Sequence, residues 1–237
     1  MSALRAEWTK LRTTPGPAWL LPAAAFVTAA LGAAVSAVAP GPGTDPARLA
    51  LSGVYLGQAP VAVLAVLAVS GEFSTALIRT TLTAIPNRAA VLSAKASAVA
   101  VAVFAAAGVA VLASLLIARV PLTEGPVLRA GVGTVAYLVL VALLSLGVAA
   151  AVRDSGGAIG VVLGLLYLPP LLTQMVPDPH LQRLLERGSP MSAGLAVQAT
   201  TNLDRLPIGP WAGLGVLAAW SAASLLVGGI LLRARDV

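Results

Sequence analysis

The stretch GEFSTALIRTTLTAIPNRAAVLSAK, residues 71–95, is the longest chemically mixed run between two apolar segments on the basic side of the molecule. Read as a helix, its first half has two faces. Apolar and polar side chains occupy opposite arcs: Phe73, Leu77, Ile78, Leu82 and Ile85 on one, and Glu72, Thr75, Arg79, Thr80 and Thr83 on the other. Pro86 ends this helix, and Asn87 can cap a second helix that begins at Arg88. On physical grounds alone, an ordinary loop on a membrane surface is the more frequent explanation of such a segment.

The composition around this stretch is that of a membrane protein. Of the 237 residues, 58% are hydrophobic and 10% are charged, and the mean hydropathy is +0.93. Soluble domains carry about 25% charged residues. The chain has no cysteine, which excludes disulfides and thiolate metal sites. The net charge of +6 is explained by basic residues held on the cytoplasmic side of a membrane, so nucleic acid is not an expected partner.

The segment before the first apolar run predicts a helix lying flat on the membrane. Leu4, Trp8 and Leu11 recur at helical spacing, with Lys10 and Arg12 beside them. A tryptophan ring prefers headgroup depth. Residues 1–17 are therefore expected to form an interfacial helix that ends at the prolines before residue 18.

Six apolar runs follow, each long enough to cross about 30 Å of hydrocarbon. The predicted fold class is an all-α membrane protein with a single permease-like domain over 1–237. Spans one to five lie within 18–176, an outer loop covers 177–210, and the last span and tail cover 211–237. The predicted spans are Ala18–Ala39, Leu49–Ser70, Ala96–Ala118, Ala130–Val152, Ala158–Val176 and Trp211–Leu232.

The longest connection, Pro177–Pro210, contains two further helical patterns. His180–Arg187 is amphipathic, with its three leucines on one face. Met191–Thr200 is apolar but too short to cross a membrane, which indicates a re-entrant or surface helix.

Six spans place both termini on one side, and the distribution of charge selects that side. The side with the termini and residues 71–95 carries nine basic and four acidic residues, a net charge of +5. The opposite side carries six basic and five acidic residues, a net charge of +1. By the positive-inside rule, the termini and residues 71–95 are cytoplasmic.

Signatures of catalysis are weak. Asp154-Ser155-Gly156-Gly157 resembles the nucleophile loop of some serine proteases, but the histidine of the chain, His180, lies across the membrane in this topology. A tight polar turn is the better interpretation. One histidine without cysteine is not a metal site, and no GxxxxGK[ST] phosphate loop occurs. We therefore expect no catalytic residue, metal or cofactor in this chain.

Several polar or small residues within the spans have two open interpretations. Gly156, Gly160 and Gly164 recur every four residues, which suits either packing within one bundle or a dimer interface. Gln58, Thr173 and Gln174 are polar groups within apolar runs, and each can line a transport path or bridge two helices.

Residues 71–95 also carry a family resemblance. The stretch is similar to the first cytoplasmic loop of bacterial type-2 ABC exporter permeases of the actinobacterial type, whose members read GE[YF]STGTIRTTL followed by a proline, a basic residue and an AK pair. Ala76 and Leu77 depart from the usual Gly-Thr, whereas thirteen positions match: Glu72, Phe73, Ser74, Thr75, Ile78, Arg79, Thr80, Thr81, Leu82, Pro86, Arg88, Ala94 and Lys95. Glu7–Thr14, EWTKLRTT, is similar to the EWxKLRS opening of the same group, and the order of elements agrees.

The resemblance implies a function for the opening stretch. In such permeases this loop forms a coupling helix that docks in a groove of a separate ATPase subunit, and the ATPase binds ATP and Mg²⁺. Two ATPases and two permeases form the exporter in the bacterial plasma membrane. The two permeases are identical or paralogous. The coupling residues implied here are Glu72, Phe73, Ser74, Thr75, Leu77, Ile78, Arg79, Thr80, Thr81, Leu82, Pro86 and Arg88. Trp8, Lys10, Leu11 and Arg12 would belong to its elbow helix. The apolar spans suit a hydrophobic or amphipathic cargo such as a drug, lipid or peptide antibiotic, and export of such cargo would connect the chain with multidrug or antibiotic resistance. A secondary transporter is the alternative, and an intramembrane enzyme is a weaker one.

Overall fold

The structure is a computed structural model that describes residues 15–38, 41, 43–74 and 88–234. Within these residues every regular element is a helix, and six helical segments are long and apolar enough to span a membrane. The elements, in chain order, are α2 (Pro15–Val38), α3 (Pro46–Leu51), α4 (Val54–Ser74), α6 (Arg88–Ile117), α7 (Gly125–Val152), α8 (Ser155–Met175), α9 (Pro179–Gly188), α10 (Pro190–Leu195), the 3-10 turns η1 (Ala196–Gln198) and η2 (Leu203–Arg205), and α11 (Pro210–Ala234).

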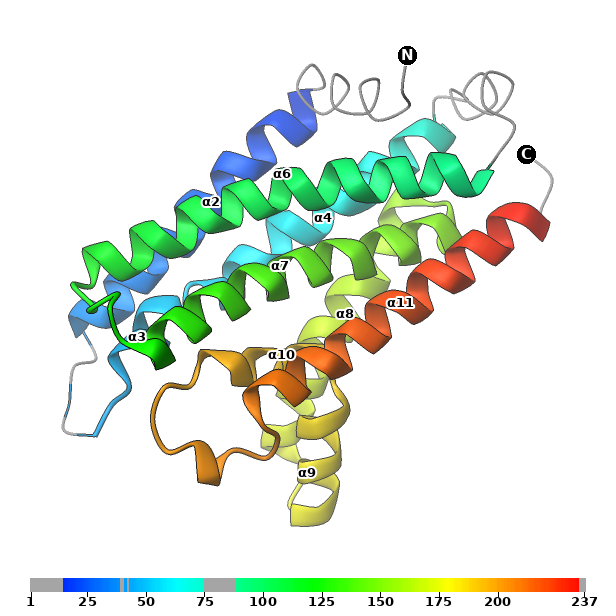
Figure 1. Ribbon diagram of the computed structural model, residues 1–237. Helices are drawn as coiled ribbons and strands as arrows, with labels where there is room; N and C mark the ends of the chain where they lie inside the picture. Colours follow the sequence, from blue (N-terminus) through cyan, green and yellow to red (C-terminus); the bar gives the residue numbers. More distant parts are fainter. Residues whose placement is uncertain (1–14, 39–40, 42, 75–87, 235–237) are drawn as a thin grey trace.

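The helix α7 is the centre of the bundle. It packs most extensively against α11, and it also contacts α4, α6 and α8 (Figure 1). Sixteen of its 28 residues are buried, including Tyr137, Leu144 and Leu146. The helix α2 packs on the other side of α4 and α6. The core therefore consists of the inner faces of α4, α6 and α7, with α2, α8 and α11 at the periphery.

Both described ends of the chain lie at the same end of the bundle, which we call the proximal end (Figure 1). The opposite, distal end carries α3, α9, α10 and η2. Figure 1 also shows α8 running at an angle to the other long helices, with α9 at its distal end.

Short connections with well-defined caps join several helices. Arg153 ends α7 with a left-handed backbone, φ 64°. Asp154 then caps α8, because its side chain accepts a hydrogen bond of 2.6 Å from the Gly157 amide. Side-chain acceptors of this kind satisfy the free amides of a first helical turn. The interpretation of this segment as a tight polar turn agrees with the structure.

The predicted spans coincide with the six long segments, with shifted ends. The second predicted span, Leu49–Ser70, is not one helix: α3 ends at Leu51, and α4 begins at Val54. Ser52 donates its hydroxyl to the Leu49 carbonyl at 2.7 Å. Gly53 lies against α2, where a Cβ atom would fall 1.9 Å from the Thr28 carbonyl oxygen. The break lets α2 approach closely at this point.

The long connection before α11 is largely ordered helix. His180–Arg187 lies within α9, which confirms the predicted amphipathic helix. Met191–Thr200 covers α10 from its second residue, η1 and the two residues after η1, and its residues are nearly all buried. We call Pro190–Gln198 the distal insert. It packs between α7, α8 and α11, as a re-entrant segment would.

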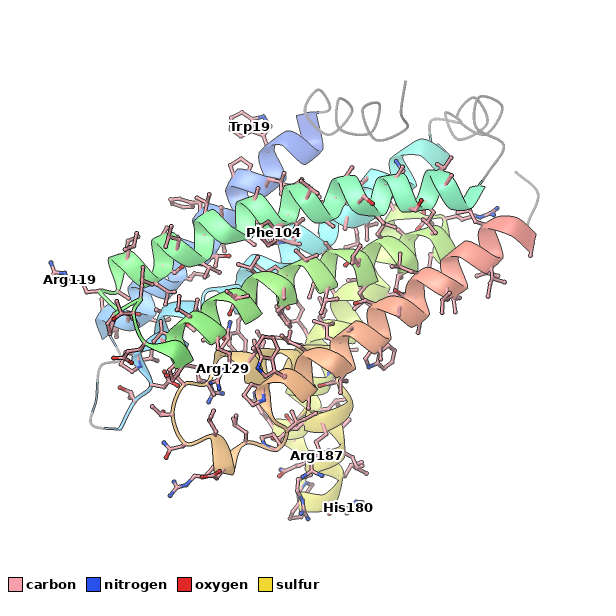
Figure 2. The ribbon with its side chains drawn as sticks, viewed as in Figure 1. Trp19, Phe104, Arg119, Arg129, His180 and Arg187 are labelled. Carbon is pink, nitrogen blue, oxygen red and sulfur yellow. The ribbon has the colours of Figure 1, made fainter. Side chains whose placement is uncertain are left out.

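The outer surface of the bundle is apolar. Trp19 on α2 and Phe104 on α6 point away from the bundle and are 77% and 63% exposed (Figure 2). Exposed aliphatic side chains also cover the outward faces of α8 and α11. Apolar patches this extensive are rare on soluble monomers, so the surface fits a lipid environment.

Candidate functional site

The predicted coupling segment lies mostly outside the described residues. Glu72, Phe73 and Ser74 are the last three residues of α4, and Arg88 is the first residue of α6. The other predicted coupling residues, Thr75, Leu77, Ile78, Arg79, Thr80, Thr81, Leu82 and Pro86, fall outside the described ranges, as do Trp8, Lys10, Leu11 and Arg12 of the predicted interfacial helix. The start of α6 at Arg88 agrees with the predicted second helix.

The helices on either side of this segment are tied together next to it. Lys95 on α6 is 4% exposed, and its Nζ donates a hydrogen bond of 2.9 Å to the Ala68 carbonyl oxygen on α4. The sequence placed Lys95 before the third span, but α6 begins eight residues earlier than Ala96 and includes this side chain in the bundle. A lysine that leaves water needs such an acceptor, because an unpaired buried cation is costly.

A buried polar cluster joins α4, α7 and the distal insert. The Tyr137 hydroxyl on α7 donates to Oε1 of Gln58 on α4. Gln58 Nε2 lies 3.2 Å from both the Tyr55 carbonyl oxygen and the Met191 sulfur atom. At the exposed edge of this cluster, Tyr167 on α8 donates to the same Tyr55 carbonyl at 2.6 Å. Gln58 therefore bridges helices, which is one of its two predicted roles.

Polar contacts of three residue pairs hold the chain at and just after the C-terminal end of the distal insert. Gln198 Nε2 donates to the Leu51 carbonyl oxygen at 3.2 Å, at the end of α3. Arg129 of α7 points toward the insert (Figure 2), and its Nη2 donates to the Ala199 carbonyl oxygen at 2.5 Å. Asp45 accepts from the Thr200 hydroxyl at 2.6 Å and from the Thr200 amide at 2.5 Å. The insert is thus attached to α3, α7 and the connection before α3.

The Asp45 carboxylate is the charged member of this attachment. It also accepts from the amides of Arg48, at 3.1 Å, and Thr201, at 3.1 Å. Burial alone would raise the pKa of the Asp45 carboxyl, but the hydrogen bonds from Thr200, Arg48 and Thr201 outweigh burial and lower the pKa below its usual 3.8. Hydrogen bonds to a charged form favour that form. The contact is therefore strongest with Asp45 ionised.

Missing Cβ atoms let the insert lie directly on its neighbours. A Cβ at Gly213 of α11 would fall 1.9 Å from the Ala193 carbonyl oxygen. A Cβ at Gly133 of α7 would fall 2.1 Å from a Val197 methyl carbon. Close helix contacts at small residues are characteristic of membrane bundles. These glycines fix the depth to which the insert enters the bundle.

The predicted glycine stripe on α8 is not used in this way. Among the described residues, a Cβ at Gly160 would meet no atom within 4 Å, and one at Gly164 would touch Leu168 of the same helix at 3.6 Å. Gly156 is exposed, with Asp154 as its neighbour. Gly160 and Gly164 line a groove of about 860 Å³ between α8 and α11 that α7 floors. Packing within the described bundle therefore does not account for the stripe.

The other polar residues predicted within the fifth span have local surroundings. The Thr173 hydroxyl donates to the Pro170 carbonyl oxygen of the same helix at 2.7 Å. Gln174 is exposed. The structure does not bring either side chain together with Gln58. In the described part of the chain, no group of three or more His, Cys, Asp or Glu residues could hold a metal ion.

Sequence reasoning missed Asp45, Tyr137, Arg129 and Gln198. One signal was available: Asp45 stands directly before Pro46, a pairing typical of a helix start.

No family model matches this chain, and no curated protein matches it. The family resemblance of residues 71–95 therefore stays a prediction.

Proposed function

We propose that this chain is the membrane-spanning permease subunit of an ATP-driven exporter, with ATP hydrolysis carried out by a separate ATPase subunit. The motif in residues 71–95 carries the proposal. Its support in the fold is the set of six span-length helices, with the two ends of the segment belonging to α4 and α6. The cargo is hydrophobic or amphipathic, and the termini are cytoplasmic.

The contacts of α4 indicate how a displacement of residues 75–87 would be transmitted to the rest of the bundle. An ATPase that moves residues 75–87 acts on α4 and α6 together, because Lys95 ties the two helices at Ala68. Farther along α4, Gln58 contacts Tyr137 of α7 and Met191 of the distal insert. A displacement of α4 therefore changes contacts at both ends of the bundle. Movement of one packed element against another is a common form of gating.

Co-purification from membranes tests the proposal. A tagged wild-type chain is compared with a variant in which Leu77, Ile78 and Leu82 are changed to Asp. We expect an ATPase subunit to co-purify with the wild type and to be lost from the variant, because an amphipathic helix binds a partner's groove through its apolar face. The control variant, Thr83→Asp, places an aspartate on the polar arc at a position outside the implied coupling residues and should retain the ATPase.

The outcomes separate the alternatives. Loss of the ATPase from both variants would show that added charge, not the apolar arc, breaks the contact. Absence of an ATPase from the wild-type preparation would overturn the exporter assignment, and secondary transport would then be tested by ion-gradient-driven uptake.

A further inference from the structure

The amphipathic helix α9 leaves part of its apolar face uncovered. Leu181 and Leu184 are 43% and 55% exposed, whereas Leu185 and Glu186 turn partly toward the bundle. His180 lies on the polar side and points away from the bundle at its distal end (Figure 2), whereas Arg187 Nε donates a hydrogen bond of 2.6 Å to the Pro207 carbonyl oxygen before α11. The helix thus presents an apolar strip and a charged strip side by side.

Hydrogen bonds hold α9 against α8 and α11, so this exposure is a property of the fold. Gln182 Nε2 donates to the carbonyl oxygens of Thr173, at 3.2 Å, and Val176, at 2.7 Å, in the last turn of α8 and just after it. Pro177 has no amide hydrogen, so it cannot serve the Thr173 carbonyl, and Gln182 replaces it. At the other end of α9, Trp220 Nε1 donates to the Gly188 carbonyl at 3.0 Å.

The exposed leucines continue a surface that already belongs to a span. In the last two turns of α8, Leu171 and Met175 are 53% and 72% exposed. Trp211, in the first turn of α11, is 61% exposed at the same distal end. Tryptophan rings concentrate at the boundary between hydrocarbon and headgroups. The apolar strip of α9 therefore extends the apolar surface of α8 to the level of this boundary.

We propose that α9 lies in the headgroup region of the distal leaflet, with Leu181 and Leu184 inserted among phospholipid acyl chains and the exposed Arg183 at the level of the phosphates. An interfacial helix buries its apolar face about 5–10 Å into this boundary, and arginine extends its charged group toward water and phosphate. This inference rests on the membrane setting of the proposed function and does not depend on an ATPase partner.

Site-specific fluorescence in phospholipid vesicles tests the location of α9 relative to the lipid. Because the chain has no cysteine, Leu184→Cys introduces a unique site for an environment-sensitive label such as NBD. Arg183→Cys places the same label one residue away on the charged strip. Leu226→Cys, on an exposed apolar position of α11, is the reference for lipid contact. Doxyl-labelled phospholipid and aqueous iodide are the two quenchers.

We expect label 184 to emit at shorter wavelength than label 183 and to lose more intensity to doxyl lipid than to iodide, with the reverse order at 183. Stronger quenching of both labels by iodide would place α9 in water and overturn the proposal. Access of neither quencher to 184, with lipid access at 226, would mean that protein covers the leucines, and would also overturn it. Iodide access at 226 would remove the membrane setting itself.

Discussion

The hydroxyl of Tyr137 on α7 donates a hydrogen bond to the side-chain oxygen of Gln58 on α4, and both side chains are fully buried. The amide group of Gln58 in turn reaches Met191 of the distal insert. Polar contacts of Gln58 in the core thus connect two long helices with the distal insert.

Removing the Tyr137 hydroxyl should destabilise the bundle. Tyr137→Phe keeps the ring but leaves a buried oxygen of Gln58 without its donor, which costs about 1–3 kcal/mol. Thermal unfolding of the detergent-solubilised protein should show a lower Tm. In the double variant Gln58→Met with Tyr137→Phe, both polar partners are gone, and part of the loss should be recovered. An additive loss in the double variant would contradict this account.

Substitutions at the glycines that contact the distal insert test how deeply the insert packs into the bundle. Gly213→Ala introduces a methyl group 1.9 Å from the Ala193 carbonyl oxygen, and the backbone must move. We expect a loss of about 1–3 kcal/mol, as is usual for overpacking. Gly215→Ala, two residues along the same helix, meets no described atom within 4 Å and is the matched control. It should be neutral or stabilising by up to about 1 kcal/mol. Equal Tm values for the two variants would refute the close packing of α10 against α11.

The Asp45 contact predicts a dependence of stability on pH. The pKa of Asp45 is lowered in the folded protein. The contribution of the ionised carboxylate to folding stability is therefore complete above pH 3.8 and is lost as the pH falls through the lower folded pKa. Asp45→Asn should therefore have a lower Tm than the wild type near pH 6, and the difference should narrow below 3.8. Asp204→Asn, at an exposed carboxylate of the same end, should leave the Tm unchanged. A difference in Tm between Asp45→Asn and the wild type that does not change with pH would show that the charge of the Asp45 carboxylate is not involved.

The proposed coupling role predicts a loss of transport with little loss of folding. Glu72→Lys or Arg79→Glu should separate ATP hydrolysis from transport while the chain still inserts, because both residues belong to the proposed ATPase contact. The measurement is the ratio of cargo moved to ATP hydrolysed in reconstituted vesicles containing both subunits. An unchanged ratio would remove the assigned role from these two charges.

The glycine stripe of α8 predicts contact with a second copy of this chain. Gly160→Cys should form a disulfide-linked dimer in oxidised membranes, because small residues let helices approach closely and the groove beside Gly160 is open. Phe104→Cys, on the exposed face of α6, should remain monomeric. Crosslinking of both variants at equal rates would indicate random collision. A monomeric Gly160 variant would favour a different interface or a paralogous partner.

Hydropathy was sufficient to predict the six spans, since an apolar run of this length has few other solutions. The amphipathic pattern of His180–Arg187 was equally clear, and α9 confirms it. The buried course of Met191–Thr200 was predicted only as one of two options. Its length excluded a span, but the choice between surface and interior depends on residues such as Gly133 and Gly213 that are remote in sequence.

The polar contacts could not be predicted for a related reason. Gln58 and Tyr137 are 79 residues apart, and Asp45 and Thr200 are 155 apart. Nothing in the local pattern at Gln58 distinguishes a helix bridge from a residue of a transport path. Lys95 was placed outside the third span because charge usually ends an apolar run. Its acceptor at Ala68 becomes visible only when α4 and α6 are packed together.

The attachment of Asp45 to Thr200 also has a consequence for how the chain is made. A protein synthesised from its N-terminus exposes the Asp45 carboxylate long before Thr200 leaves the ribosome. The Thr200 and Thr201 amides that hold the carboxylate become available only after five of the six long segments have been synthesised. Closure of this contact therefore marks a late step of assembly, and nascent chains shorter than this point should remain sensitive to added protease at the distal end.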